Sequence, residues 1–560
     1  MKSKVGERRW EILAKDKARD EQQIIKTLLA NRGITTKTGR KEFFNPAAPA
    51  KIKLKELGIS PKSVEKAILR LKKAKKNKEK IFIYGDYDAD GICATAIVWE
   101  CLYSLGFDVL PYIPERFSEG YGINVESVGK LKEADDKFKL VITVDNGIVA
   151  SKEIEAVNKL GVDVIISDHH QKEATLPKAH AIIYTDRICG AAVAWIFARE
   201  ILKKFKISSL KFNIQEAIGL SGIGTIADQM PLTGFNRSFA KSGLGELRRT
   251  KRPGLLEIYR GSRIDPNTIG TYEVNYIIAP RINAMGRIEH GIDSLRMLCT
   301  TSRQKAVELA NKLGKVNQLR QKIVEEVLVT ARKSFAVEKK QKIIIISNAS
   351  YHEGVIGLAA GKLVEEFYLP AIVISRGEKI SKASARSISG FNIIEAIRHF
   401  DDILEAGGGH PMAAGFSILT ERIEDFTQKM LLYSAEMVSD DMLSKKLKID
   451  MELDFDQLTP KLHETLKEGE PFGIGNPQPV FMTQDVEVVD SRIIGKEKNH
   501  LKLKLKDKGV SFWAVGFGMA EAFSGLDPEK KIDVAYNLEE NAWNGSVSLE
   551  LKLKDLRLGR

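Results

Sequence analysis

Between Lys80 and Phe205 the sequence alternates short apolar runs with helical patterns, and this alternation restricts the fold more than any other feature. The apolar runs are rich in β-branched residues and have the length of buried strands. Because strands separated by helices need crossover connections, they pair in parallel within a sheet that helices cover. The sequence therefore predicts an α/β fold with a parallel sheet. The expected strands are residues 80–84, 109–113, 139–144, 162–166 and 181–184, and the expected helices are residues 92–105, 151–160 and 191–205.

Three of the expected strands end in acidic or imidazole side chains. These side chains are Asp86, Asp88 and Asp90 after strand 80–84, Asp145 after strand 139–144, and Asp168, His169 and His170 after strand 162–166. Parallel strands bring their carboxyl ends to one edge, where open α/β sheets bind ligands. Acids at such close spacing repel one another unless water screens them or a cation offsets their charge, so a metal site is favoured over a plain acidic turn. A fourth candidate, Asp228, ends a glycine-rich stretch, residues 222–228, that we expect to be a turn.

The ligand types indicate which metal and which chemistry. A ligand set of carboxylates with one or two imidazoles suits Mn²⁺ or Mg²⁺ better than it suits zinc, which is often bound by thiolates. The candidate ligands exceed what one ion needs, and two ions sharing a carboxylate form a phosphoryl-transfer site. The sequence contains neither a P-loop pattern nor a Ser-His-Asp nucleophile elbow, which disfavours Walker-type nucleotide hydrolysis and serine hydrolase chemistry.

Composition narrows the partners. The formal net charge of +13 and the pI of about 9.2 favour a polyanionic partner, nucleic acid first. There is no run of 18 apolar residues and no apolar core near the amino terminus, so we expect neither a membrane span nor a secretory signal. The four cysteines form no CxxC pair and are expected to be reduced thiols. These features together predict a cytoplasmic protein.

Four short motifs carry a family resemblance. They are DYDADG at 86–91, VDNG at 144–147, SDHH at 167–170 and GTIAD at 224–228. In this order and spacing they resemble the motifs of the DHH phosphoesterase superfamily. Further segments, APRINAMGR at 279–287, YHEGVIG at 351–357, GGHPMAAG at 408–415 and EPFGIGNP at 470–477, are similar to those of the RecJ family of single-strand-specific exonucleases. The resemblance extends from about residue 50 to residue 560.

The resemblance implies roles for individual residues. One metal ion would be held by Asp90, Asp145, His169 and Asp228, and a second by Asp86 or Asp88 together with the shared Asp145. His170 would face the scissile phosphate, and Asp168 would orient the histidines, as metal-binding imidazoles generally require. The expected catalytic residues are thus His170, Asp168 and Asp145. Substrate phosphates would be bound by Arg281, Asn283, Arg287, Ser384, Arg386, Gly408, Gly409 and His410.

The same resemblance and the local patterns divide the chain. We expect an amino-terminal helical and basic segment (1–75), a DHH catalytic domain (76–300), a long connecting helix (301–340), a second α/β, DHH-associated domain (341–440) and an OB-like β-barrel (445–560). The glycine triplet before His410 is expected to form a turn. In the last segment, period-two alternation of apolar and lysine residues at 500–506 predicts a basic barrel face, and Trp513, Phe517 and Trp543 are candidates for base stacking or for the barrel core.

Three functions stay open at this point. The first, which the full motif set favours, is a metal-dependent 5′-to-3′ exonuclease on single-stranded DNA in recombination and repair, acting as a monomer with a single-strand-binding protein and a helicase as expected partners. The second is a phosphodiesterase on short oligonucleotides or cyclic dinucleotides, which would not need the barrel. The third is a non-catalytic nucleic-acid-binding relative, against which the intact acids and histidines argue.

Overall fold

The computed structural model describes residues 8–18, 20–205, 212–335, 341–520, 531–543 and 546–558. The chain divides into two compact units. One comprises Lys37–Arg320 with Glu470–Pro477 and is called the parallel-sheet unit; the other comprises Met1–Thr36, Gln321–Gly469 and Gln478–Arg560 and is called the barrel unit. The expected long helix is confirmed as α14 (Arg303–Phe335), and the division between the units falls within it. Within the described residues no helix is long and apolar enough to cross a membrane.

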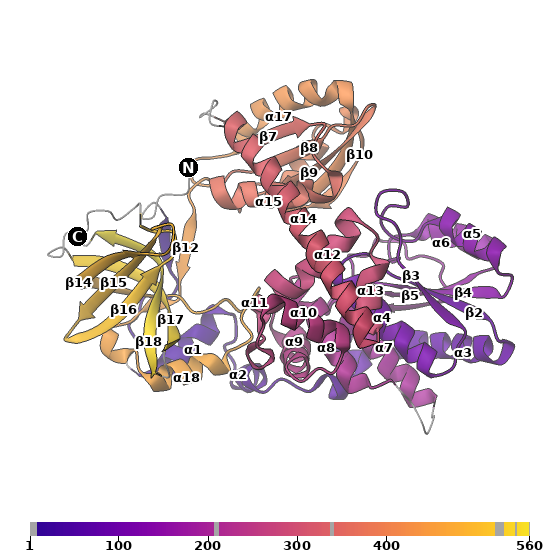
Figure 1. The fold of residues 1–560 in the computed structure, drawn as a ribbon, viewed down its shortest axis with the longest axis horizontal. Coiled ribbons are helices and arrows are strands. Elements are labelled where there is room, and N and C mark those ends of the chain that lie inside the picture. The colour runs from indigo at the N-terminus through magenta and orange to yellow at the C-terminus, as the bar shows by residue number, and fades with distance from the viewer. Residues whose placement is uncertain are drawn as a thin grey trace. The chain divides into compact units, whose positions relative to one another are not determined.

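The predicted parallel sheet is confirmed in the parallel-sheet unit (Figure 1). Its strands are β2 (Lys80–Tyr84), β3 (Val109–Tyr112), β4 (Phe138–Val144), β5 (Asp163–Asp168) and β6 (Ala181–Tyr184). They lie in the order β3-β2-β4-β5-β6, and every pair is parallel. The chain thus moves from β2 to one side for β3 and to the other side for β4. Open sheets of this kind bind ligands at that switch point, beside the carboxyl ends of β2 and β4.

Helices cover both faces of this sheet (Figure 1). On one face lie α5 (Val125–Ala134) and α6 (Ser151–Lys159), and their apolar residues share a core with alternate residues of β2, β4 and β5. On the other face lie α3 (Pro61–Asn77), α4 (Ala89–Ser104) and α7 (Gly190–Lys204), which share the larger core. Because α4 lies between the sheet and further helices, it is apolar or small around most of its circumference.

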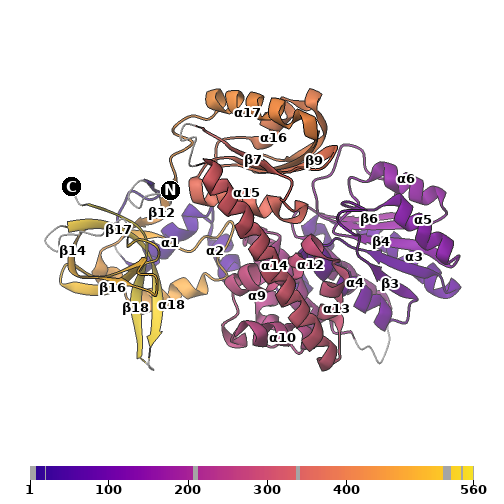
Figure 2. The same cartoon turned by 45° about the horizontal axis from the view of Figure 1, so that its top comes forward.

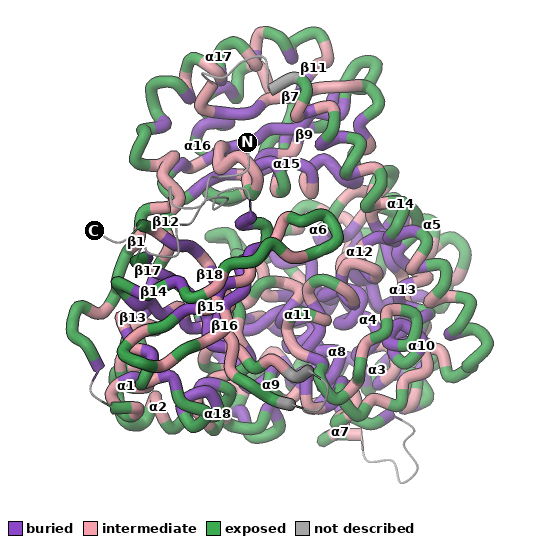
Figure 3. The backbone as a smooth tube through the Cα atoms, turned by 60° about the vertical axis from the view of Figure 1, so that its left-hand side comes forward, coloured by how far each residue is buried: buried purple, intermediate pink, exposed green. Residues whose placement is uncertain are grey.

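Further helices extend this core. They are α8 (Ile214–Ala227), α9 (Gly234–Leu247), α10 (Pro253–Ser262), α12 (Ala279–Ile288) and α13 (Ile292–Cys299). The same unit also contains α2 (Lys37–Phe44) and α11 (Thr271–Glu273). The expectation of a glycine-rich turn at 222–228 is wrong, because these residues form the carboxyl-terminal half of α8, which is buried along almost its whole length (Figure 3). The glycines serve helix packing: a Cβ on Gly222 would lie 2.7 Å from Cα of Gly243 on α9.

The barrel unit contains a mixed sheet, ordered β10-β11-β9-β8-β7. Its elements are β7 (Ile344–Asn348), α15 (Glu353–Phe367), β8 (Ala371–Ser375), β9 (Ile380–Arg386), α16 (Ile393–Arg398), β10 (Leu404–His410), β11 (Ala413–Leu419) and α17 (Ile423–Met437). Helices α16 and α17 lie beside the sheet (Figure 2) and share one hydrophobic core with it. The glycine triplet is not a turn but part of edge strand β10, paired in antiparallel with β11.

A five-stranded barrel completes this unit, as predicted. Its strands are β14 (Phe481–Ile494), β15 (His500–Asp507), β16 (Val510–Gly516), β17 (Lys531–Trp543) and β18 (Ser546–Leu558), and pairing of β14 with β17 closes the ring. The carboxyl-terminal segment, residues 445–560, is not entirely β-structure, because it contains the helix α18 (Pro460–Glu468), which Thr459 caps. Two short strands precede the barrel, β12 (Lys446–Ile449) and β13 (Met451–Glu452).

The amino-terminal residues join the barrel unit. The expected amino-terminal helical segment, residues 1–75, is not helical at β1 (Arg9–Ile12), which pairs in parallel with β12. The helix that follows, α1 (Glu21–Asn31), places Ile24 and Leu28 in the barrel core. The partner strand is more than 400 residues away in sequence, so no local pattern reveals this pairing.

Candidate metal centre

The carboxyl ends of β2 and β4 carry the acids that the sequence analysis singled out. Asp86 follows β2 and is buried. Asp88 caps α4, where its Oδ1 accepts hydrogen bonds from the backbone N–H groups of Asp90 (2.9 Å) and Gly91 (3.0 Å). Asp145 directly follows β4 with a φ of 63°, a left-handed conformation that few residues other than glycine adopt. Such a strained backbone is typical of a functional site.

Asp90 connects two helices at the sheet edge. It lies in the first turn of α4, and its carboxylate accepts hydrogen bonds from Gly190 N (2.7 Å) and Ala191 N (2.9 Å) in the first turn of α7. The N–H groups and the positive end of the α7 dipole favour a carboxylate at this position. The sequence therefore folds so that a helix terminus fixes the position of one acid beside the others.

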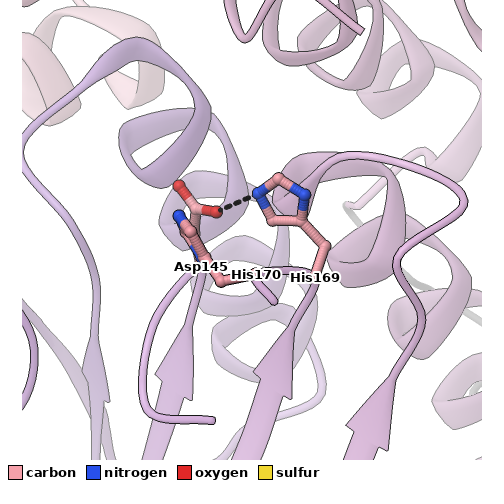
Figure 4. A group of neighbouring side chains, drawn as sticks. All are labelled: Asp145, His169 and His170. Carbon is pink, nitrogen blue, oxygen red and sulfur yellow. Dashed lines mark ion pairs between the residues drawn. The ribbon is translucent and has the colours of Figure 1, made fainter. Parts of the chain in front are cut away.

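His169 points from the end of β5 into these acids. Its Nε2 atom lies 3.1 Å from Asp145 Oδ1, 3.7 Å from Asp90 Oδ2 and 3.7 Å from Asp228 Oδ2. Figure 4 shows its ring facing Asp145 above the strand ends. Burial lowers the pKa of His169, so that its nitrogen is a lone-pair donor at neutral pH. The structure thus brings Asp90, Asp145, Asp228 and His169 around one point.

Asp86 and Asp88 form a second group with Asp145. Each of the three residues has one carboxylate oxygen that lies within 4.8 Å of the corresponding oxygens of the other two. Asp90, His169 and Asp228 meet the same criterion, as do Asp145, His169 and His170. Asp145 therefore belongs to both the acidic group and an imidazole group, the position that a shared ligand would need.

Burial and mutual repulsion raise the pKa values of several of these acids. Burial, and then the neighbouring Asp88, raise the pKa of Asp86 well above its usual range. Burial and the carboxylates of Asp90 and Asp88 do the same for Asp145, and raise the pKa of Asp228 to about 8. A bound divalent cation would reverse these shifts by offsetting the charge.

Family models match three parts of the chain. Residues 80–223 match the DHH family N-terminal domain, residues 340–435 the DHHA1 domain and residues 449–555 the RecJ OB domain. The chain is 34% identical to the single-stranded-DNA-specific exonuclease RecJ of Bacillus subtilis, over 98% of this chain and 70% of that protein. This chain belongs to the RecJ family. The RecJ of Thermus thermophilus is 33% identical over 89% of this chain and 71% of its own length.

Solved RecJ structures share the fold and contain metal. The structure of RecJ from Thermus thermophilus with Mn²⁺ matches this RecJ-family chain with a TM-score of 0.82 at 29% identity, covering 98% of this chain and 79% of that one. The same protein with Mg²⁺ matches with a TM-score of 0.74 at 27% identity, covering 98% and 78%. The expected fold class and the expected metal-dependent phosphoesterase class are thereby confirmed.

The residues of this RecJ-family chain fit divalent cations. Oδ1 of Asp145 is buried and accepts no hydrogen bond from the described residues, so it has a lone pair to offer a metal ion. Two glycines give the carboxylates their space: a Cβ on Gly190 would lie 2.3 Å from Asp145 Oδ1, and one on Gly224 would lie 2.1 Å from Asp90 Oδ1. Carboxylate oxygens with one neutral imidazole are the donor set that Mn²⁺ and Mg²⁺ accept.

Asp168 and His170 form a pair beside the acids. His170 Nδ1 lies 2.8 Å from Asp168 Oδ1. Asp168 is buried and also accepts hydrogen bonds from Ile148 N (2.9 Å) and His169 N (2.7 Å). Burial acts to lower the pKa of His170, but the hydrogen bond to Asp168 and the negative charges of Asp168, Asp228 and Asp86 together outweigh it and raise this pKa to about 9. His170 is thus a cation at neutral pH, unlike its neighbour His169.

Two residues at this edge were missed by sequence reasoning. Both lie on the loop between β3 and α5. Tyr121 places its hydroxyl 3.1 Å from His170 Nε2. Arg116 lies 4.9 Å over the ring of Tyr87, and its charge acts to lower the pKa of Asp86. The available signal was position alone, because this loop follows a parallel strand and so begins at the same edge.

Helix α12 carries three predicted phosphate-binding residues. Asn283 uses its Oδ1 to accept a hydrogen bond from Ala89 N (2.6 Å), so it positions the first turn of α4. Arg281 Nη1 donates to Ile277 O (2.8 Å). The positive charge of Arg287 acts on Tyr87, which follows Asp86. The structure therefore places these residues in the parallel-sheet unit, with Asn283 bonded to the first turn of α4, which carries Asp90.

The other predicted phosphate-binding residues lie in the barrel unit. Strand register sets Arg386 opposite Ala413 and Ala413 opposite His410, and likewise Ser384 opposite Gly415 and Gly415 opposite Gly408. Residues directly opposite, and those two apart, share one sheet face. Ser384, Arg386, Gly408 and His410 therefore share a face, whereas Gly409 belongs to the opposite one. A Cβ on Gly357 of α15 would lie 2.9 Å from Ser384 Oγ and 3.2 Å from Arg386 Nη2.

The barrel aromatics divide by environment. Trp513 has two cations near its ring, the guanidinium of Arg492 at 5.5 Å and the ammonium of Lys502 at 5.1 Å. Phe517 is exposed. The side chain of Trp543 lies outside the described residues. The alternation in β15 buries Leu501, Leu503 and Leu505 in the barrel core, which leaves the intervening lysines on the outer face.

Proposed function

We propose that this RecJ-family chain hydrolyses single-stranded DNA to mononucleotides from the 5′ end with two divalent cations. The observation that carries the proposal is the sharing of Asp145 between an acidic group and an imidazole group at the switch point of the sheet. The RecJ relatives support the substrate, because they are single-stranded-DNA-specific exonucleases. We assign hydrolysis to residues 76–300 and strand binding to residues 341–440 and 445–560.

The ligand assignment follows the two groups. Asp90, Asp145, His169 and Asp228 would hold one Mn²⁺ or Mg²⁺ ion, and Asp86 and Asp88 would hold the other with Asp145. When bound, the ions would make a water nucleophilic at neutral pH and offset charge on the phosphate oxygens. The chain prepares this site by holding Asp90 on the α7 terminus and Asp88 on the α4 terminus, so that the acids need no rearrangement.

His170 acts on the phosphate rather than as a ligand in this proposal. Its pKa of about 9 makes it an imidazolium, which donates hydrogen bonds and binds cations poorly. Asp168 fixes the ring through Nδ1 and leaves Nε2 for a phosphate oxygen. The hydroxyl of Tyr121 contacts that Nε2 atom. When a phosphate is bound, this hydroxyl would either move away from Nε2 or hydrogen-bond to the same phosphate oxygen. Positive charge at this position would stabilise the charge that develops in the transition state.

The terminal phosphate of the strand is the ligand that we assign to the polar face of β9, β10 and β11. Arg386 offers a planar guanidinium, which suits phosphate geometry. Ser384 and His410 share its face, and glycines at 408 and 415 leave the backbone accessible between them. Burial lowers the pKa of Arg386, and an anion would compensate its desolvated charge.

End-labelled single strands test the proposal. With Mn²⁺, a 5′-labelled strand should release its label as a mononucleotide at once, whereas a 3′-labelled strand should shorten progressively. A duplex of the same sequence should persist. Release of the 3′ label first, or equal cleavage of short dinucleotides and long strands, would contradict the polarity or the polymer substrate.

Asp145→Asn tests the mechanism in the same assay. Asparagine tolerates the left-handed backbone at this position, so the variant should fold and bind DNA, as fluorescence anisotropy would show. It lacks the negative charge that two cations would share, so we expect hydrolysis to be lost. Turnover at the unmodified rate would overturn the assignment of Asp145.

A further inference from the structure

Two exposed tyrosines lie with their rings side by side, tilted relative to each other, directly before α12. Tyr272 is 63% exposed and Tyr276 is 68% exposed, and their ring centroids lie 4.9 Å apart with the planes inclined by 33°. Tyr272 belongs to α11, and Tyr276 to the π-helical turn Val274–Ile278 that continues it. Two adjacent exposed rings form an apolar surface rather than a single exposed side chain, and π-helical turns occur frequently at functional sites.

A hydrogen bond connects this pair to the metal centre. Gln229 follows Asp228 and has a φ of 58°, which turns the chain sharply at the end of α8. Its side-chain amide donates to Asn275 Oδ1 (3.0 Å), the residue before Tyr276. Both ends of this connection lie in the parallel-sheet unit, so the segment that carries Tyr276 is bonded to the residue that follows Asp228.

A basic residue follows the pair along the chain. Arg281 lies one turn beyond Tyr276, and its guanidinium donates to Ile277 O (2.8 Å), so it is held at the same segment. Aromatic faces beside positive charge are the features by which proteins bind unpaired nucleotides, since every base offers a π-face and every linkage a phosphate. Bases of a duplex are already stacked and paired, so they cannot use such a platform.

We propose that Tyr272 and Tyr276 form a stacking platform for unpaired bases of the strand held at the metal centre. The inference rests on the proposed single-strand exonuclease function and adds a source of single-strand selectivity within the parallel-sheet unit. The occupant is a nucleic-acid base. A protein partner or a purely structural contact is the competing outcome of the test.

Substitutions at the pair test the platform, and Tyr103 offers a matched control. Tyr103 is also 63% exposed and stacked, on Trp99 at 5.4 Å, but it lies near the carboxyl end of α4, about 20 Å along the helix from the acids. The variants are Tyr272→Ala, Tyr276→Ala, their double variant, Tyr276→Leu, Tyr276→Phe and Tyr103→Ala in the full chain. Thermal melting confirms that each is folded.

The first readout is hydrolysis. The alanine variants should raise KM for single strands roughly 5- to 100-fold, the range for loss of stacking on one base, with a smaller change in kcat. Tyr276→Phe should retain most of the affinity, Tyr276→Leu should not, and Tyr103→Ala should match the unmodified protein. Strands with abasic sites near the cleaved end should bind the unmodified protein and the alanine variants equally.

The second readout is independent of hydrolysis. In the Asp145→Asn background, 2-aminopurine near the 5′ end should be quenched on binding, and Tyr276→Ala should remove that quenching. Unchanged KM and quenching in the double variant, or equal losses on abasic strands, would overturn the platform. An unmodified protein that cleaves no single strand would instead overturn the proposed function, so the two failures are distinguishable.

Discussion

At the scale of single residues, the space around Asp145 is as specific as its charge. Its Oδ1 faces His169 and lies where only a residue without a side chain fits at position 190. The acids themselves were predictable, because carboxylates after successive strands of a parallel sheet must converge. Gly190 was not predictable, because its neighbour in space is 45 positions away and its own sequence context is an ordinary helix start.

Gly190→Ala should abolish or severely reduce metal-dependent hydrolysis without unfolding the chain. The new Cβ would lie 2.3 Å from Asp145 Oδ1 and displace the carboxylate. Gly129→Ala on α5 is the matched control, because nothing lies within 4 Å of its Cβ, and it should be neutral or slightly stabilising. Full activity of Gly190→Ala at all Mn²⁺ concentrations would contradict the packing described.

The clustered acids should make the metal-free protein sensitive to pH. The pKa of Asp228 is about 8 in the folded chain, against an ordinary value of 3.8, and those of Asp86 and Asp145 are also raised. Because the folded state holds these protons more tightly, their contribution to stability is present below pH 4 and lost as pH rises to about 8.

In EDTA, the melting temperature should therefore fall between pH 5 and pH 8 more than in Mn²⁺, and Mn²⁺ should stabilise more at pH 8 than at pH 5. Asp228→Asn should reduce this difference. Differential scanning fluorimetry across the pH range measures it, and an identical pH profile with and without Mn²⁺ would contradict the cluster as a cation site.

At the scale of elements, the glycine-rich segments were the ones whose secondary structure the sequence predicted wrongly. Residues 222–228 and the triplet before His410 were both expected to be turns, but one is in helix α8 and the other in strand β10. Glycine permits a turn, a close helix crossing and an open strand edge alike, and its sequence context does not say which. The start of α18, by contrast, has a local signal, because Thr459 followed by Pro460 is a pair typical of a helix start.

Gly222→Ala should destabilise the parallel-sheet unit by about 1–3 kcal/mol, the cost of overpacking a close contact. Its Cβ would lie 2.7 Å from Cα of Gly243 across the α8–α9 crossing. Gly245→Ala, on the same helix α9 with nothing within 4 Å of its Cβ, should instead be neutral or stabilising. Urea unfolding compares the two variants, and equal midpoints would contradict the tight crossing.

At the scale of the whole molecule, the two ends of the described chain pack against each other. Trp10 donates a hydrogen bond from Nε1 to the buried Asp555 (2.7 Å), and the guanidinium of Arg557 lies 4.3 Å from its ring. The first described residues are thus part of the last domain. Motifs and periodicity predicted the individual domains because those signals are local, whereas pairing across the full chain length leaves no local trace.

Trp10→Ala should therefore lower the stability of the barrel unit, by about 1–3 kcal/mol for a half-buried aromatic that also hydrogen-bonds. Leu13→Ala, an exposed neighbour, is the control and should change it little. The measurement is the rate of proteolytic cleavage within residues 478–560, which should rise in Trp10→Ala and not in Leu13→Ala. Equal cleavage rates in the two variants would contradict the association.

The count of manganese ions in the intact protein tests the central claim most directly. Equilibrium binding followed by Mn²⁺ electron paramagnetic resonance should show two ions per chain, with the spectral broadening of neighbouring ions. Asp145→Asn, which changes the residue shared by both groups, should weaken both sites together. One ion per chain, or two ions whose binding Asp145→Asn leaves unchanged, would contradict a paired centre built at the switch point of the sheet.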